Sequence, residues 1–492
     1  MRELNCDACV IGGGPAGAAM ARRLAMLGHA VILVEKARFP RRHIGESVTP
    51  AVLPLFEILG IREIVEHAGF LRPGGALVRW TSGDTQYREA RGDAGFQVER
   101  ERFDSLLLDA ARSAGASVLQ PCRLLAWEQS PDGGWRIQVR TDSGGVAVRA
   151  RILADATGRT SIAGGRKQAT SPATLALSGY WRGVPSPGVE TRIEAGTSEW
   201  YWGAPLANGE FNATVFIDPE RYRAGTLKSG SQEAFYAELL GNSVLLRDCL
   251  NGRLVSGPRA CDSTCYADDE PVTNGSIRTG EAAFTIDPLS SQGILTAMGS
   301  ALHAATVLHT IFRRPQDTAV AVEFYRNRVQ SSVRLHRRAA GDFYTQAAAR
   351  FATDFWQDRA LPETDAPGAE AMNAPFPGWG DLVALSPAVR IGSVPVVSGS
   401  FITAGRGVFA PALEEPAVFL NGVPVAPLMS VLDEPRTMCE LIQRWEFLLP
   451  RSVAVDVLGW AFGKGIVVRS RSGSLETNST DRVLPCISPS SK

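Results

Sequence analysis

The clearest periodic pattern lies in the first 35 residues, where two apolar runs flank a glycine-rich turn. Ala8–Ile11 predicts a buried strand, Ala18–Leu27 a helix and Ala30–Val34 a second strand. The residues from Gly12 to Gly17, with the sequence Gly-Gly-Gly-Pro-Ala-Gly, join the first strand to the helix, and Glu35 follows the second strand. This order of strand, glycine turn, helix, strand and acid predicts a dinucleotide-binding unit.

The glycines of this turn have physical roles in such a unit. Gly12 permits the tight turn, Gly14 lets a diphosphate approach the backbone, and Gly17 lets the helix pack closely on the strand. The helix N-terminus offers free N–H groups to the phosphates, and Glu35 is placed to accept a ribose hydroxyl. The alternative is a glycine-rich turn that holds no ligand.

The pattern changes character along the chain and predicts an α/β (α+β) fold with three parts. These are a Rossmann-type nucleotide-binding domain, an inserted antiparallel sheet that forms a substrate domain, and a small winged-helix-like domain at the C-terminus. We expect the nucleotide domain at 1–165, with part of the substrate region near 60–100, the antiparallel sheet at 166–275, the return of the nucleotide domain with a helical segment at 276–358, a linker at 359–384, the small domain at 385–470 and a disordered tail at 471–492.

Individual elements can be placed within these segments. Phe103–Ala114 has apolar residues at helical spacing, whereas Thr174–Trp181 and Phe211–Ile217 are strand-like. Ala319–Trp356 predicts long helices interrupted at Gly341.

In the small domain, a helix over Arg436–Ile442 begins with Thr437 and has Glu440 three residues later, which is typical of a capping box. A second helix is expected over Ser452–Phe462, followed by a turn and strand over Gly463–Val468.

Charge and cysteine content exclude several function classes. The chain has 51 basic and 51 acidic residues among 492, so nothing suggests a nucleic-acid or anionic-membrane surface. No apolar run reaches the roughly 18 residues needed to span a bilayer. Cys6 and Cys9 lie on the first strand, where packing is favoured over metal binding, and we expect no metal site. A cytoplasmic protein with reduced thiols is the simplest interpretation.

Three further segments indicate the cofactor. They are Gln97–Asp104, Ile152–Arg159 and Thr279–Leu289, the last followed by Ser-Ser-Gln-Gly-Ile at 290–294. Together with the glycine turn, their order and spacing over roughly the first 310 residues resemble the flavoprotein monooxygenases of the para-hydroxybenzoate-hydroxylase type. The resemblance implies FAD as the cofactor.

The same resemblance implies the residues that hold FAD. Glu281 replaces the family's aspartate at the ribityl chain, Pro288 and the Gly293 turn lie beside the isoalloxazine, and Arg100 reaches the cofactor. An exposed helix-entry arginine is the alternative for Arg100. The implied FAD-binding set is Gly12, Gly14, Ala16, Gly17, Glu35, Lys36, Arg42, Ser47, Arg100, Glu281, Pro288, Gly293 and Ile294.

Two segments resemble the flavin-dependent halogenase branch of the same superfamily. They are Phe39–Ser47 and Trp200–Pro205, although a packed strand face explains Trp200 and Trp202 equally well. Halogenases use a lysine near the flavin, and by alignment Arg72 takes its place here. Arginine holds its proton too firmly for that role, with a pKa above about 12. The lysines of the chain are Lys36, Lys167, Lys228, Lys464 and Lys492, and none lies near Arg72 in sequence.

The resemblance therefore favours oxygen transfer to an aromatic ring through a flavin C4a-hydroperoxide. Glu46, Asp287 and His43 are the candidates for activating the ring. A salt bridge to Arg41 or Arg42 is the alternative role for Glu46, and a core or adenine-side contact the alternative for His43. No separate nicotinamide-binding motif is present, so NAD(P)H must visit transiently or a flavin reductase supplies the electrons.

The C-terminal part of the sequence narrows the class of substrate that we expect. The small domain is similar to the winged-helix domains with which peptide-modifying enzymes hold a peptide by strand addition, and simple packing or dimerisation is the alternative. A halogenase-like flavoprotein without the lysine and with such a domain resembles the monooxygenases of cysteine tryptophylquinone maturation. This resemblance implies hydroxylation of a tryptophan in a protein or peptide. The alternatives are a halogenase or hydroxylase of a small or carrier-bound aromatic in secondary metabolism, and a flavin-containing scaffold.

Overall fold

The computed structural model describes residues 2–470 apart from 91, 132, 163, 164, 166, 274 and 363–375. It separates into two compact units, Met1–Pro362 and Glu363–Lys492. The predicted disordered tail at 471–492 and residues 363–375, which are half of the predicted linker, lie outside the described residues. The first unit contains two large sheets, and the second is a small mixed α/β unit.

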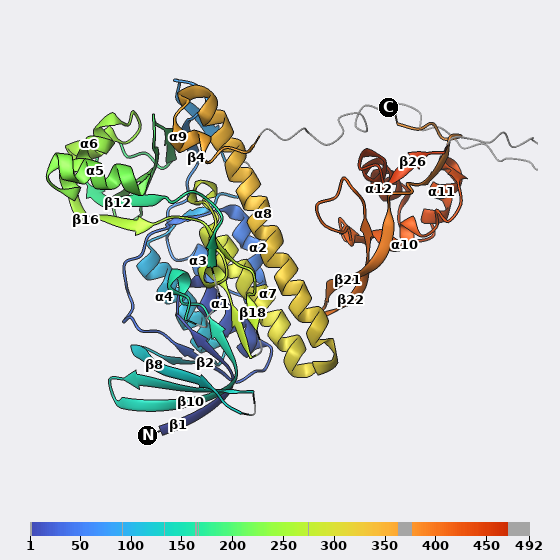
Figure 1. Ribbon diagram of the computed structural model, residues 1–492, viewed down its shortest axis with the longest axis horizontal. Helices are drawn as coiled ribbons and strands as arrows, with labels where there is room; N and C mark the ends of the chain where they lie inside the picture. The colour runs from blue at the N-terminus through green and yellow to red at the C-terminus, as the bar shows by residue number, and fades with distance from the viewer. Residues whose placement is uncertain are drawn as a thin grey trace, which may run out of the picture. The chain divides into compact units, whose positions relative to one another are not determined.

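An eight-stranded sheet forms the centre of the nucleotide-binding part (Figure 1). Its parallel strands, in spatial order, are β19 (Ser276–Arg278), β10 (Gly144–Asp155), β1 (Arg2–Ile11), β2 (Val31–Val34) and β7 (Ser117–Leu119). Antiparallel strands extend it: β18 (Val272–Thr273) pairs with β19, β9 (Trp135–Thr141) with β10, and β8 (Cys122–Gln129) with β9. The predicted strand–helix–strand unit is confirmed.

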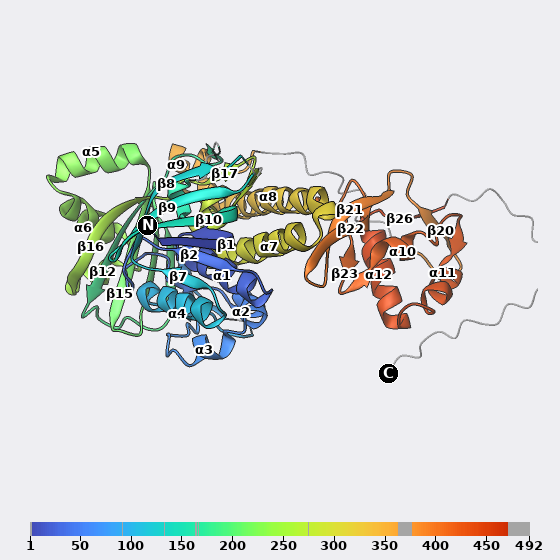
Figure 2. The same cartoon turned by 90° about the horizontal axis from the view of Figure 1, so that it is seen from below.

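Helices and a hairpin cover the two faces of this sheet (Figure 2). The helices α1 (Pro15–Met26), α4 (Arg100–Ser113) and α7 (Gly293–Arg313) pack on one face, and the β8–β9 hairpin closes the other over Cys9, Ile32 and Val148. Helix α7 is long and apolar enough to cross a membrane by length and composition, contrary to the sequence expectation. However, 61% of that apolar window is buried inside the fold, where α7 contacts α1, so α7 is a core helix here.

A seven-stranded sheet forms the second layer. In spatial order its strands are β16 (Arg253–Asp262), β12 (Leu175–Arg182), β15 (Glu210–Ile217), β14 (Trp200–Pro205), β13 (Thr191–Ala195), β4 (Gly75–Arg79) and β5 (Gln86–Glu89). Only β13 and β4 run parallel, so the strands predicted around Thr174–Trp181 and Phe211–Ile217 do belong to an antiparallel arrangement. The segment near 60–100 joins this sheet through β4 and β5.

The two faces of the seven-stranded sheet have different neighbours. One packs through Tyr201 and Phe211 on α6 (Gln232–Asn242), beside α5 (Pro219–Ser229). The other packs through Trp200 and Phe216 on α8 (Thr318–Phe351) and α9 (Asp354–Gln357). The first unit also contains shorter elements: β3 (Ser47–Val48) paired with β6 (Phe96–Gln97), β11 (Lys167–Ala169) paired with β17 (Tyr266–Asp268), and the helices α2 (Leu53–Leu59) and α3 (Arg62–Glu66).

Helix α8 corrects one sequence expectation. It runs without interruption through Gly341, where a break was predicted. A Cβ atom at Gly341 would lie 2.6 Å from side-chain atoms of Leu361. The glycine therefore allows the segment after α9 to cross close to the helix, and it does not end the helix.

The second unit combines a three-stranded sheet with three helices. The sheet has the order β25 (Arg436–Thr437), β20 (Leu382–Leu385), β26 (Val467–Arg469) and the helices are α10 (Val425–Met429), α11 (Met438–Trp445) and α12 (Arg451–Gly463). Two ribbons, β21 (Arg390–Ser398) with β22 (Phe401–Phe409) and β23 (Phe419–Leu420) with β24 (Val423–Pro424), complete it. The predicted capping box of Thr437 and Glu440 is present at the start of α11.

The capping box provides a test of the second unit in the intact chain. T437A removes the hydroxyl that accepts from the N–H of Glu440, so the free energy of opening α11 should fall by about 1 kcal/mol. Amide hydrogen exchange along α11 measures this quantity. T437S keeps the hydroxyl and is the matched control; equal protection in both variants would contradict the predicted role of the cap.

Candidate functional site

The glycine turn keeps the N-terminus of α1 free of capping side chains, so this end of the helix can bind an anion. An added Cβ at Gly17 would overlap the carbonyl oxygen of Gly12, whereas one at Gly14 would meet only Arg41, at 3.7 Å. The first turn of α1 has neither a side-chain cap nor an acidic residue, so its N–H groups face an open cradle that suits a diphosphate. Glu35 closes the turn by accepting hydrogen bonds from the N–H groups of Gly13 (2.6 Å) and Ala37 (2.7 Å).

Arg100 is the first residue of helix α4 and is only 7% exposed. The alternative hypothesis, that Arg100 is an exposed arginine at the start of a helix, is therefore wrong. Its guanidinium makes two bonds to Asp104 (2.9 and 3.0 Å) and one to the carbonyl of Ile44 (2.6 Å). The carboxylate of Asp104 and the nearby Glu46 raise the pKa of Arg100 despite its burial. Arg100 is therefore a fixed, permanent positive charge beside the loop that carries Gly45.

The other predicted cofactor residues occupy several elements around the same turn. Ala16 is buried in α1 against Gly280, Ser47 lies in β3, Ile294 is buried in α7, and Lys36 and Arg42 are exposed, Arg42 with an ion pair to Glu210 at 3.2 Å. Their contact with a cofactor stays a prediction.

Lys167 was not among the predicted site residues, yet it ties two of these segments together. Its amine donates to the carbonyls of Gly158 (3.4 Å), Arg159 (3.3 Å) and Glu281 (2.6 Å). An ammonium group has three N–H bonds, and three carbonyls accept them. Desolvation lowers the pKa of Lys167. No sequence pattern could have revealed this clamp, because the partners of Lys167 are backbone atoms up to 114 residues away.

Loss of the clamp should weaken cofactor binding. In K167M the three carbonyls lose their donor and the turns carrying Arg159 and Glu281 separate, so we expect the dissociation constant for FAD to rise about tenfold. Flavin fluorescence titration of the apoprotein measures it, and K167R should recover part of the loss.

The matched control for this change is K228M, since Lys228 is exposed near the end of α5. An unchanged dissociation constant in K167M, or the same change in K228M, would contradict the clamp.

Asp287 lies in the loop that leads into α7. One oxygen of its carboxylate accepts from the N–H of Leu289 (3.0 Å) and the other from the hydroxyl of Tyr344 (2.9 Å). Desolvation raises the pKa of Asp287, and no ion pair reaches it within the described residues. Pro288 and Gly293 follow, and the first turn of α7 has no acidic residue or side-chain cap, which suits a negatively charged group at its N–H groups.

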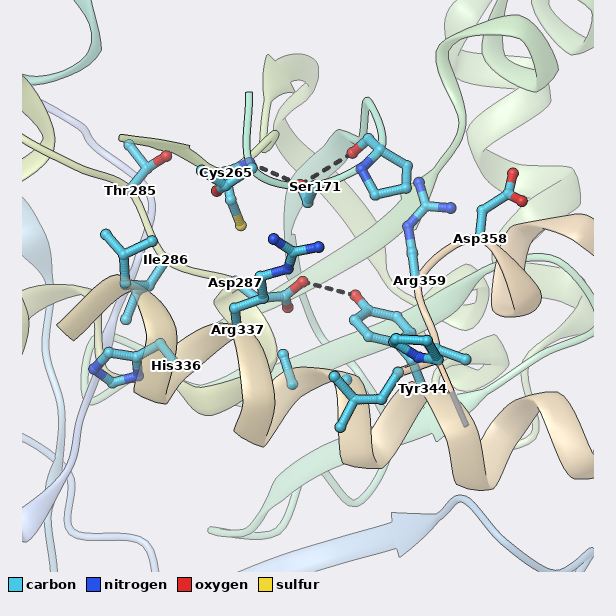
Figure 3. Close-up of a pocket in the computed structure, with 18 residues that line it drawn as sticks. Ser171, Cys265, Thr285, Ile286, Asp287, His336, Arg337, Tyr344, Asp358 and Arg359 are labelled. Carbon is cyan, nitrogen blue, oxygen red and sulfur yellow. Dashed lines mark hydrogen bonds between the residues drawn. The ribbon is translucent and has the colours of Figure 1, made fainter. Parts of the chain in front are cut away.

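Asp287 and Tyr344 line a cavity that encloses about 620 Å³ including its open mouth (Figure 3). We call it the Asp287 cavity. Its walls come from 170–172, Cys265, 285–287, α8 between Val333 and Tyr344, and 358–362. The ring of Tyr344, Ile286 and Ala340 give this cavity an apolar part, as small-molecule sites commonly have.

Glu46 lines a second, smaller cavity of about 280 Å³ together with Arg42, His43, Arg100 and Tyr180. The carboxylate of Glu46 is 2% exposed and accepts bonds from the Tyr180 hydroxyl and from Asn212 (3.3 Å). Desolvation raises its pKa.

Arg41 and Arg42 do not take up the alternative role of a salt bridge to Glu46. They pair with Asp104 (3.5 Å) and Glu210 (3.2 Å).

His43 lies at the open side of this second cavity, where its Nδ1 contacts the carbonyl of Ile44 at 2.8 Å. Desolvation and the charge of Arg100 lower its pKa, so the imidazole is neutral near pH 7 and donates Nδ1–H to Ile44. Its Nε2 is then left as an acceptor. The structure brings His43 and Glu46 into one cavity and places Asp287 in the other.

The halogenase-like positions pack in other ways. Arg72 is 41% exposed on its side chain, stacks over Phe96 and lines neither cavity. Trp200 and Trp202 lie on the sheet face toward α8, where Trp200 stacks on Phe216 with ring centroids 3.7 Å apart. The packed strand face is thus the arrangement observed.

Among the described residues, no group of three or more His, Cys, Asp or Glu side chains could hold a metal ion. Cys6 and Cys9 are buried in the core as free thiols.

Comparison with known proteins agrees with this geometry. The FAD binding domain family matches residues 5–179. The tryptophan 2-halogenase of Chondromyces crocatus is 33% identical over 370 residues, which cover 72% of this chain and 70% of that protein.

Two solved structures are similar over nearly the whole chain. The flavin-dependent halogenase CmlS has a TM-score of 0.79 at 20% identity, covering 97% of this chain and 98% of that one. The peptidyl tryptophan dihydroxylase QhpG, essential for tryptophylquinone cofactor biogenesis, has a TM-score of 0.71 at 26% identity, covering 94% of this chain and 99% of that one.

Proposed function

The chain belongs to the superfamily of FAD-dependent monooxygenases and halogenases, and we propose that within it this enzyme hydroxylates the indole ring of a tryptophan in a protein or peptide. Its cofactor is FAD. The observation that carries the proposal is the Asp287 cavity, where the Tyr344 hydroxyl and the Asp287 carboxyl group lie together beside apolar side chains and no described lysine lines the space.

The residues that would hold FAD are those around the glycine turn. The N-terminus of α1 would bind the diphosphate, Glu35 the ribose, and Arg100, Arg42 and the Glu281 turn the remaining chain. When bound, FAD supplies the activation of dioxygen and the electrophilic oxygen atom. NAD(P)H or a flavin reductase would supply electrons.

The Asp287 cavity would orient and activate the ring. The Tyr344 hydroxyl donates a hydrogen bond to Asp287, and this bond makes the Tyr344 oxygen a stronger acceptor for an indole N–H. Accepting this hydrogen bond increases the electron density of the ring and so favours attack on an electrophilic oxygen. Glu46 and His43, in the second cavity, would hold protons released during the reaction.

The available lysines support hydroxylation over halogenation. No described lysine lines either cavity, and the three N–H bonds of Lys167 are engaged by carbonyls. The second candidate, halogenation of a small or carrier-bound aromatic, is favoured by the 33% identity to a tryptophan 2-halogenase.

A product assay distinguishes the two candidates. The holoenzyme, given reduced flavin, air and bromide together, should increase the mass of a tryptophan-containing polypeptide by whole oxygen atoms. Mass spectrometry of tryptic fragments locates the change, and a polypeptide with phenylalanine in place of the tryptophan is the control. Bromine in the product would establish the halogenase function in place of hydroxylation.

The Tyr344–Asp287 pair can be tested through pH dependence. The Tyr344 hydrogen bond lowers the pKa of Asp287 against the effect of burial, so in Y344F that pKa should rise and the acid limb of kcat should move to higher pH. The loss of the Tyr344 oxygen that would accept the indole N–H should also lower kcat about tenfold at pH 8.

Y201F is the matched control, because Tyr201 also donates to a buried carboxylate, Glu199, but on the opposite face of the seven-stranded sheet. An acid limb that stays in place in Y344F, or moves equally in both variants, would show that the pair is not involved.

A further inference from the structure

The ionisable side chains of the Asp287 cavity differ in whether they have partners. Asp287 accepts from Tyr344, and Arg359 donates to Asp218 (2.7 Å) and to the Ala173 carbonyl (2.9 Å). Burial lowers the pKa of His336, which adds no positive charge near neutral pH. Within the described residues, neither Arg359 nor His336 therefore leaves an unpaired positive charge for an anionic ligand to neutralise.

Arg337 is different. It lies on α8 and lines the cavity, and none of the described side chains forms a hydrogen bond or ion pair with its guanidinium. Figure 3 shows the side chain rising from α8 into the cavity. Asp358, at another part of the cavity wall, likewise forms no hydrogen bond or ion pair with a described side chain, Arg337 included. The guanidinium of Arg337 is thus partly exposed to solvent, without a partner among the described residues, and borders the space in which the ring would bind.

We propose that Arg337 binds a carboxylate of the substrate while the aromatic ring contacts Tyr344 deeper in the cavity. This inference rests on the proposed function and names the substrate class further: an indole with a carboxylate near it. The carboxylate belongs either to an acidic residue beside the target tryptophan or to the α-carboxylate of free tryptophan.

The chemistry of the side chain supports a carboxylate. A guanidinium presents N–H donors in a planar fork that matches the two oxygens of a carboxylate, and such charge-assisted bonds are stronger than neutral ones. The two other acidic groups of the cavity do not compete, because Asp287 is held by Tyr344 and Leu289 and no ion pair joins Asp358 to Arg337. The cavity also has the apolar surface that an indole requires.

Binding to the FAD-loaded enzyme tests the proposal without turnover. The probes are the peptides acetyl-Trp-Glu-amide and acetyl-Trp-Gln-amide, together with free tryptophan and tryptophanamide, titrated by calorimetry in the absence of reductant. We expect the carboxylate member of at least one pair to bind about tenfold more tightly than its amide. In R337Q this preference should disappear while binding of the amides is unchanged, and R337K should restore part of it.

The matched control is R334Q, one turn earlier on α8, where Arg334 is exposed, does not line the cavity and donates to Ser331 (3.0 Å). R334Q should keep the full preference for carboxylates. The peptide pair and the amino-acid pair identify the source of the carboxylate.

Equal binding of acid and amide in both pairs, an equal loss for acid and amide in R337Q, the same effect in R334Q, or no measurable binding of any probe would overturn the proposal. The proposed function fails separately: a carboxylate preference without any oxygenated product would leave Arg337 as an anchor and exclude hydroxylation. Oxygenated product without a carboxylate preference would leave hydroxylation standing and exclude the anchor.

Discussion

The fold depends on three glycines at which neighbouring segments of the chain pack so closely that no side chain would fit. Gly12, with φ at +106°, sits against the carbonyl of Ala156, Gly17 against the carbonyl of Gly12, and Gly280 close enough to Ala16 that a Cβ would lie 2.8 Å from its methyl group. These contacts bring β1, β10, α1 and the turn before α7 to one point. Any larger residue would separate the elements that carry the cradle of α1 from those that carry Glu281 and Asp287.

One chemical arrangement recurs in the first unit: a tyrosine hydroxyl donates to a carboxyl group that is buried or half-buried. Tyr180 donates to Glu46, Tyr344 to Asp287 and Tyr201 to Glu199. Glu199 also forms an ion pair with Arg221, which fixes it as a structural anion. Among the described residues, Glu46 and Asp287 have no such ion pair and both line cavities, and desolvation raises their pKa values. These features are why we propose the two residues for proton exchange in the reaction.

Local patterns in the sequence were sufficient where the physics is local. The glycine turn, the helix from Arg100 and the capping box at Thr437 each depend on residues within a few positions of one another, and each is present. The break predicted at Gly341 was wrong because the glycine serves a contact with Leu361, twenty residues later.

The parts of the site that sequence could not predict are long-range contacts. Tyr344 meets Asp287 across 57 positions and Lys167 meets Glu281 across 114, and neither pair has a spacing that a periodic pattern could reveal. The three-dimensional arrangement also separated candidates that looked equivalent in sequence, placing Glu46 and His43 in one cavity and Asp287 in the other.

The uninterrupted course of α8 has a geometric consequence for any ligand of the Asp287 cavity. Arg337 and Tyr344 are seven residues apart on one rigid helix, so their Cα atoms are separated by about 10 Å along its axis and differ by only about 20° around it. A helix cannot stretch to accommodate a ligand of a different length. The distance between the Cα atoms of Arg337 and Tyr344 is therefore fixed by the helix. Selection among ligands would follow the distance between the aromatic ring and the negative charge of each ligand.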